Sequence, residues 1–128
     1  AKVANESRLA LLVEDEPEVR KVIRQQLTEL GFPVIEASNG VDARAMLEAV
    51  EDISLLISDT VMPGLGGREL AAIAHTLRPR LPILLITGYA TGDVPAGSPN
   101  FPTLRKPFDR AALAAALATL EYPETPAS

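Results

Sequence analysis

Polar side chains that can do chemistry follow directly after apolar runs of the sequence. Glu14 and Asp15 follow one run, Asp59 ends a second, Thr87 follows a third, and Lys106 comes after a short fourth. If these runs are parallel strands of one sheet, their carboxyl ends meet at one edge, where such sheets bind ligands. The sequence therefore predicts that three carboxylates, one hydroxyl and one ammonium group converge.

A cluster of this composition needs a cation. Three carboxylates held close together raise one another's pKa values unless positive charge neutralises them. A hard divalent ion held by a few carboxylates, with water completing its octahedron, is typical of Mg²⁺, which we therefore expect as the cofactor. Beside such an ion, an aspartate facing a lysine and a threonine is suited to accepting a phosphoryl group, because the cations neutralise the equatorial oxygens during in-line attack.

Strand and helix patterns alternate along the chain. Short continuous apolar runs predict strands buried on both faces, and apolar residues three and four apart predict helices. Parallel neighbours need a crossover, so we predict an α/β fold, a flavodoxin-like doubly wound five-stranded parallel sheet of order 2-1-3-4-5 with helices on both faces. The Pro- and Gly-rich segment 91–102 leaves little room for a fourth helix, which is expected to be shortened or absent. The predicted strands are 9–13, 34–37, 53–58, 81–86 and 103–105, and the predicted helices are 17–30, 41–50, about 67–77 and about 109–120.

Length and charge restrict the function classes. With 128 residues the chain is one domain, which we place at 8–121 between an N-terminal linker, 1–7, and a C-terminal tail or linker, 122–128. There is no cysteine for disulfides or thiolate sites, which is consistent with a cytoplasmic location. The net charge of −5 argues against direct binding to nucleic acid or to an anionic membrane.

Four segments of the sequence match known motifs in their order and spacing: LLVEDEP at 11–17, SDTVMPG at 58–64, ITGY at 86–89 and RKPF at 105–108. Through these segments the sequence resembles the receiver domains of two-component response regulators over nearly its whole length. The resemblance implies that Asp59 is the phosphoacceptor. It further implies that Asp15, Asp59 and the backbone carbonyl of Val61 hold Mg²⁺, with Glu14 acting mainly through a water.

The same resemblance implies roles for residues around the phosphoryl group. Thr87 and Lys106 would bind its oxygens, and Pro107 would follow a cis Lys–Pro bond that aims the lysine. The donor would be a phosphohistidine on a histidine kinase or a histidine phosphotransfer domain. His75 is out of phase with the apolar face of its helix and is not expected to be that donor. The residues of several motifs are most similar to those in receivers of hybrid sensor histidine kinases. We expect the domain to be a monomer in isolation.

The chain also departs from the family pattern. Thr103 occupies the position of the switch aromatic found in many receivers, which favours a domain that passes or stores phosphate over one that dimerises through its fourth helix, fifth strand and fifth helix. Val61 and Tyr89 flank the direction of water attack without offering an acid or amide, so slow self-dephosphorylation is expected, with Tyr89 shielding the acyl phosphate.

Two alternatives stay open. An aspartyl-phosphate hydrolase of the haloacid dehalogenase type would also use an aspartate at a strand end, but Val61 stands where that family needs a second aspartate. A phosphorylation-independent interaction module on the same fold is less favoured, because every predicted site position carries a chemically competent group. The sequence leaves open whether the domain is an enzyme beyond its own phosphorylation.

Overall fold

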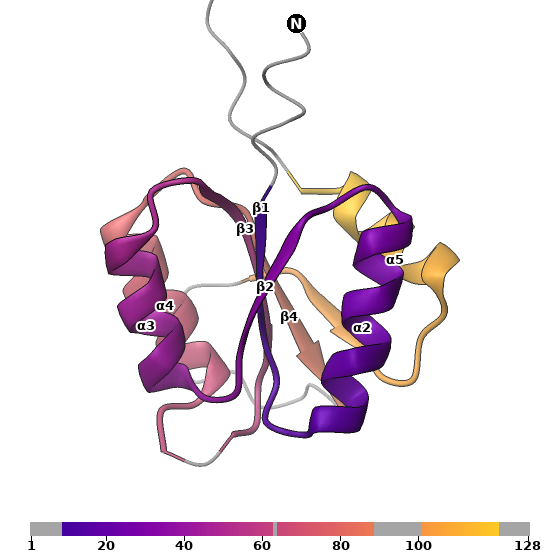
Figure 1. Ribbon diagram of the computed structural model, residues 1–128, viewed down its shortest axis with the longest axis horizontal. Coiled ribbons are helices and arrows are strands. Elements are labelled where there is room, and N and C mark those ends of the chain that lie inside the picture. Colours follow the sequence, from indigo (N-terminus) through magenta and orange to yellow (C-terminus); the bar gives the residue numbers. More distant parts are fainter. Residues whose placement is uncertain (1–8, 63, 89–100, 121–128) are drawn as a thin grey trace, which may run out of the picture.

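The computed structural model describes residues 9–62, 64–88 and 101–120, which form one five-stranded sheet and four helices (Figure 1). The predicted linkers 1–7 and 122–128 lie outside these residues. So does most of segment 91–102, between the fourth and fifth strands, where a helix is expected to be shortened or absent. The elements are β1 (Leu9–Val13), α2 (Pro17–Glu29), β2 (Val34–Ala37), α3 (Gly40–Ala49), β3 (Ile53–Asp59), α4 (Gly67–Leu77), β4 (Ile83–Thr87), β5 (Thr103–Arg105) and α5 (Arg110–Ala118).

The sheet confirms the predicted fold class. All its strands run parallel, in the order β2-β1-β3-β4-β5. The chain moves from β1 to one neighbour, β2, and then crosses to the other side of β1 to form β3. The strand order therefore reverses between β1 and β3, and in such sheets the ligand crevice lies at the carboxyl ends of these two strands.

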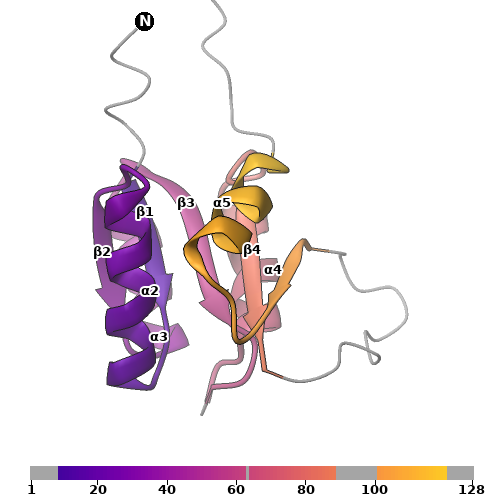
Figure 2. The same ribbon diagram turned by 90° about the vertical axis from the view of Figure 1, so that its right-hand side faces the viewer.

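Helices cover both faces of the sheet, with α3 and α4 on one side and α2 and α5 on the other (Figure 1). Viewed from the side, α2 and α5 lie next to each other in front of the strands (Figure 2). The strands feed two separate aliphatic cores by alternation: Leu11 and Val13 of β1 face the α3–α4 side, whereas Ala10 and Leu12 face the α2–α5 side. Burial on both faces explains why the strands are continuous apolar runs.

Local sequence signals fix the helix starts. Pro17 is the first residue of α2, a position where its missing N–H costs no hydrogen bond. Asn39 caps α3, since its Oδ1 accepts a hydrogen bond from the amide of Asp42 at 2.7 Å. Asp109 caps α5 in the same way, accepting from the amide of Ala112 at 2.8 Å.

One contact that ties the helices together had no local signal. Arg78, directly after α4, inserts its guanidinium into the connection between α3 and β3. It donates hydrogen bonds to the main-chain carbonyls of Leu47 and Ile53, each at 2.8 Å, of Glu51 at 3.3 Å, and of Val50. The cation thereby satisfies carbonyl groups at the C-terminus of α3, where positive charge is favourable.

Two apolar residues do not lie where the helical spacing predicts. Apolar residues three and four apart predict that Val22 of α2 and Leu77 of α4 lie on the buried faces of their helices, but these residues are 55% and 44% exposed. On the same helices, Ile23 of α2 and Leu70 of α4 are buried as expected. Among the residues that the structure describes, no helix combines the length and the apolar character needed to cross a membrane.

Candidate functional site

Three acidic side chains meet where β1 and β3 end. Asp59 is the last residue of β3, and Glu14 and Asp15 follow the neighbouring strand β1. One carboxylate oxygen from each of the three lies within 4.8 Å of the others. The structure therefore brings together the three carboxylates that the sequence predicts to converge.

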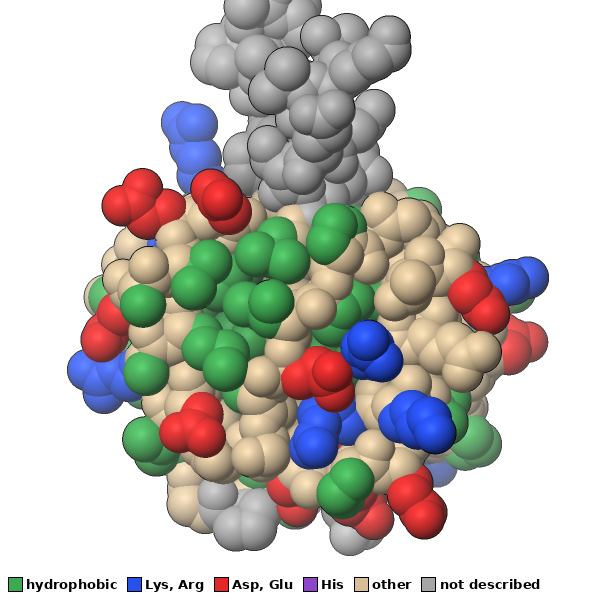
Figure 3. Space-filling view, in the orientation of Figure 1, with side chains coloured by type: hydrophobic (Ala, Val, Ile, Leu, Met, Phe, Trp, Pro, Cys, Tyr) green, Lys and Arg blue, Asp and Glu red, His purple; other side chains and the backbone are tan. Residues whose placement is uncertain are grey.

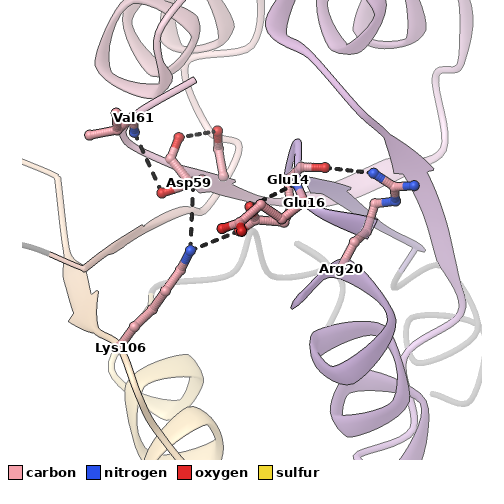
Figure 4. Close-up of polar contacts among 7 residues, drawn as sticks. Glu14, Glu16, Arg20, Asp59, Val61 and Lys106 are labelled. Carbon is pink, nitrogen blue, oxygen red and sulfur yellow. Dashed lines mark hydrogen bonds and ion pairs between the residues drawn. The ribbon is translucent and has the colours of Figure 1, made fainter. Parts of the chain in front are cut away.

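Lys106 reaches this cluster from the end of β5, the strand at one edge of the sheet. Its Nζ lies 2.9 Å from Glu14 Oε1 and 3.5 Å from Asp59 Oδ2 (Figure 4). The backbone aims it there, since the amide of Lys106 donates to the carbonyl of Thr87 at 2.7 Å and the Lys106–Pro107 peptide bond is cis. A single ammonium group thus contacts two of the three carboxylates.

Glu14 and Asp59 are buried and Asp15 is half-buried, and burial has its clearest effect on Glu14. The Glu14 side chain is 1% exposed, and this desolvation raises its pKa, helped by the nearby charge of Asp59 and opposed by hydrogen bonds from Lys106 and the Glu16 amide. Burial also acts to lower the pKa of Lys106, but the hydrogen bond to Glu14 and the charge of Asp59 outweigh it and raise that pKa. The lysine therefore stays protonated, and three acids face one ammonium group.

This arrangement suits a divalent cation. Carboxylate oxygens are the ligands that Mg²⁺ prefers, and the three acids offer them at one point with an excess of negative charge. Glu14, Asp15 and Asp59 therefore form an acidic pocket whose donor set fits a metal ion.

The remaining predicted groups surround Asp59. Thr87 is buried at the end of β4, one residue beyond Ile86, which pairs with Asp59 in the sheet. The backbone amide of Val61 lies 3.5 Å from Asp59 Oδ1 (Figure 4), so this residue turns an N–H toward the carboxylate. The metal-binding role of its carbonyl stays a prediction. Tyr89 lies outside the described residues.

Two other sequence predictions concern residues away from the cluster. Thr103 is exposed at the start of β5, and its hydroxyl donates to the carbonyl of Phe101 at 3.1 Å. His75 is exposed on α4, with its ring edge-on to Phe101. Among the residues that the structure describes, neither side chain has a hydrogen bond or ion pair with Glu14, Asp59 or the third member of the acidic cluster, Asp15.

Gly67 holds the start of α4 against the backbone of Asp59. Its amide donates to the carbonyl of Thr60 at 3.1 Å, and a Cβ at this position would lie 1.9 Å from the carbonyl oxygen of Asp59. The preceding glycine is different, because a Cβ on Gly66 would meet its nearest neighbour, the Thr60 oxygen, at 3.5 Å. Only the second of two adjacent glycines thus has to be a glycine.

We expect Gly67→Ala to lower the free energy of unfolding by about 3 kcal/mol, since relief of the overlap must move the main chain of Asp59. Gly66→Ala is the matched control and should stay within about 0.5 kcal/mol of wild type. Urea denaturation of the three proteins measures the difference. Equal stabilities for the two variants would show that the close approach at Gly67 is not required.

An apolar groove that the sequence did not reveal adjoins the cluster. It has a volume of about 330 Å³ and lies between α2 and the turn that follows β5. Exposed Val22 lies in it, and Lys106 contributes to its lining. The lining residues are Glu18, Val19, Val22, Ile23, Gln26, Lys106, Pro107 and Phe108.

Comparison with known proteins agrees with this geometry. The family model described as the response regulator receiver domain matches residues 10–118. The chain belongs to this family. The acidic cluster, Thr87 and Lys106 are thus the polar groups at the strand ends of a receiver domain.

Individual relatives include a response regulator receiver protein and a sensor kinase. The receiver domain is 40% identical over 80 residues to the response regulator receiver protein CpdR of Brucella abortus, covering 62% of this chain and 66% of that protein. It is 34% identical over 113 residues to the sensor kinase CckA of the same organism, covering 84% of this chain but only 12% of the kinase. The chain therefore spans two thirds or less of these relatives.

Solved structures give the same family. The crystal structure of a response regulator receiver protein from Sinorhizobium medicae matches with a TM-score of 0.80 and 30% identity, covering 88% of this chain and 93% of that one. The receiver domain of the hybrid histidine kinase CckA matches with a TM-score of 0.70 and 36% identity, covering 85% and 94% of the two chains.

Proposed function

We propose that this receiver domain accepts a phosphoryl group from a phosphohistidine onto Asp59 in a reaction that requires Mg²⁺. The observation that carries the proposal is the position of Asp59: a buried carboxylate at a strand end, beside two more carboxylates and 3.5 Å from the Lys106 ammonium group. A nucleophile, a metal site and a fixed cation therefore stand together.

The transfer exchanges one bond for another. A carboxylate oxygen of Asp59 attacks phosphorus, the new P–O bond forms as the P–N bond to the donor imidazole breaks, and the imidazole leaves with the electron pair. Lys106 and the hydroxyl of Thr87 bind the phosphoryl oxygens and orient them for in-line attack. Asp15, Asp59 and the Val61 carbonyl would hold Mg²⁺, with Glu14 acting through a water, and the bound ion would supply charge neutralisation to the phosphoryl group.

The groove beside Lys106 supports a protein donor. Its apolar lining and the exposed Val22 give a partner helix a surface to bury next to Asp59. We propose a histidine kinase or a histidine phosphotransfer domain as this partner, and a hybrid histidine kinase as the context, since the CckA receiver is among the solved structures that match. For a receiver in this context we propose a cytoplasmic location.

The test is incubation of the chain with a small phosphodonor, with MgCl₂ or with EDTA, followed by intact mass measurement. We expect one phosphoryl group per chain with MgCl₂ and none with EDTA. Continuous turnover of a small phosphate ester would indicate the aspartyl-phosphate hydrolase instead. No adduct from small donors or from partner kinases would indicate the phosphorylation-independent module.

We expect Val61→Asn to shorten the lifetime of the aspartyl phosphate roughly fivefold, because an amide side chain can hydrogen-bond and orient an attacking water. Val61 is 57% exposed and its amide faces Asp59, so the substituted side chain would lie beside the phosphoryl group. Val41, 66% exposed on α3, provides the control variant Val41→Asn. Decay of the adduct after donor removal gives the lifetime. An unchanged or longer lifetime in Val61→Asn would contradict the expectation that self-dephosphorylation is slow because Val61 offers no group that orients water.

A further inference from the structure

Arg20 connects the acidic cluster to the edge strand of the sheet. It lies on α2, and its Nη1 donates a hydrogen bond to the main-chain carbonyl oxygen of Glu14 at 2.8 Å (Figure 4). Its Nε donates to Glu36 Oε1 on β2 at 3.2 Å. On the face of the molecule seen in Figure 1 and Figure 3, acidic and basic side chains lie next to one another. Glu36 therefore fixes the guanidinium group that binds the loop after β1.

The carbonyl that Arg20 binds belongs to the peptide unit that joins Glu14 to Asp15. A peptide unit is planar, so fixing its oxygen fixes the orientation of the plane and the direction in which Asp15 leaves the backbone. The Glu14 carboxylate has other anchors, Lys106 at 2.9 Å and the Glu16 amide at 3.2 Å. Within the described part of the chain, no hydrogen bond or ion pair holds the Asp15 carboxylate.

We propose that Arg20 is a positioning residue for the metal site: by holding the Glu14–Asp15 peptide, it keeps the Asp15 carboxylate where the cluster needs it. This inference rests on the proposed function, because it takes Mg²⁺ as the ion that the cluster binds. Residues that orient metal ligands typically contribute a factor of 10 to 100 in metal affinity. We expect Arg20→Ala to weaken Mg²⁺ binding about tenfold.

The sign of this effect separates positioning from simple electrostatics. Removing a positive charge near three carboxylates would by itself strengthen the binding of a cation. Loss of the Arg20 charge and loss of its hydrogen bond to the Glu14 carbonyl therefore change the Mg²⁺ affinity in opposite directions. Arg24 provides a matched control. It lies one helical turn after Arg20, and its Nε is 3.2 Å from Glu36 Oε2. Within the described residues, Arg24 makes no hydrogen bond or ion pair with Glu14.

The experiment titrates MgCl₂ into the metal-free 128-residue chain and follows backbone amide NMR shifts, which report binding without phosphorylation. Wild type, Arg20→Ala, Arg20→Lys and Arg24→Ala are compared, and urea denaturation controls for folding. We expect Arg24→Ala to bind within twofold of wild type. Arg20→Lys should be intermediate, because a lysine can bind the carbonyl but lacks the forked geometry that joins it to Glu36.

A kinetic readout separates positioning from general damage. With a small phosphodonor, Arg20→Ala should need about tenfold more Mg²⁺ for half-maximal phosphorylation and yet reach a rate within about twofold of wild type at saturation. Unchanged Mg²⁺ affinity in Arg20→Ala, or equal weakening in Arg24→Ala, would overturn the inference while leaving the proposed function intact. A wild-type chain that binds no Mg²⁺ would overturn both.

Discussion

Asp59→Asn is expected to abolish phosphorylation by small donors and by partner kinases. An amide oxygen is a far weaker nucleophile than a carboxylate, and the substitution leaves side-chain size unchanged. Glu14 and Asp15 stay in the cluster, but they do not replace the acceptor, because only Asp59 combines the strand-end position with the Val61 amide at 3.5 Å and Lys106 at 3.5 Å. Intact mass after incubation with donor and MgCl₂ measures the effect.

The free energy of unfolding shows whether Asp59→Asn loses phosphorylation because the acceptor is missing or because the protein unfolds. Asp59→Asn removes a negative charge that raises the pKa of Glu14, so the repulsion between buried acids decreases. It also removes the longer of the two Lys106 ion pairs. The free energy of unfolding should therefore stay within about 1 kcal/mol of wild type. Asp52→Asn, at an exposed position before β3, is the charge-matched control and should phosphorylate normally. An Asp59→Asn protein that still gains a phosphoryl group would contradict the assignment of the acceptor.

The second large effect is expected from Lys106→Ala, which should slow phosphorylation roughly 100-fold, the usual loss when one preorganised donor to a transition state is removed. Binding of Mg²⁺ should change in the opposite direction. The ammonium group occupies one oxygen of Glu14 and lies 3.5 Å from Asp59, so its removal frees both carboxylates for a cation. We therefore expect tighter Mg²⁺ binding together with slower chemistry.

The same substitution should also destabilise the metal-free chain. Glu14 is 1% exposed and would lose the cation that is hydrogen-bonded to it, which costs about 2 kcal/mol. Added Mg²⁺ should restore most of this loss by neutralising the cluster. Lys21→Ala, which removes an exposed lysine from α2, is the control for net charge. Phosphorylation at the wild-type rate in Lys106→Ala would contradict the role given to the lysine, and weaker Mg²⁺ binding would contradict the electrostatic argument.

The sheet and its reactive edge were predictable from the sequence because both depend on local patterns. β1, β3 and β4 are buried on both faces, so they read as continuous apolar runs, and polar residues at their ends mark the carboxyl edge. In a parallel sheet this edge is shared. The sequence therefore predicts that Glu14, Asp15 and Asp59 lie together, and the structure confirms it.

What the sequence did not reveal depends on where distant segments pack. Arg20 lies six residues from Glu14, but its contact requires Glu36 on the next strand to hold the guanidinium. The sequence does not distinguish Gly66 from the adjacent Gly67. Only the packing of α4 against β3 leaves no room for a Cβ at the second of them. Val22 fits a helical stripe equally well whether it is buried or, as found, exposed in a groove.

The central claim is tested most directly by locating the phosphoryl group. Borohydride reduces an aspartyl phosphate to homoserine, so the phosphorylated chain is reduced, digested and sequenced by mass spectrometry. The proposed function predicts homoserine at position 59 only, in samples that received both donor and MgCl₂. Homoserine at position 15, or a phosphate that survives on Thr60 or Thr87 with Asp59 unmodified, would contradict it.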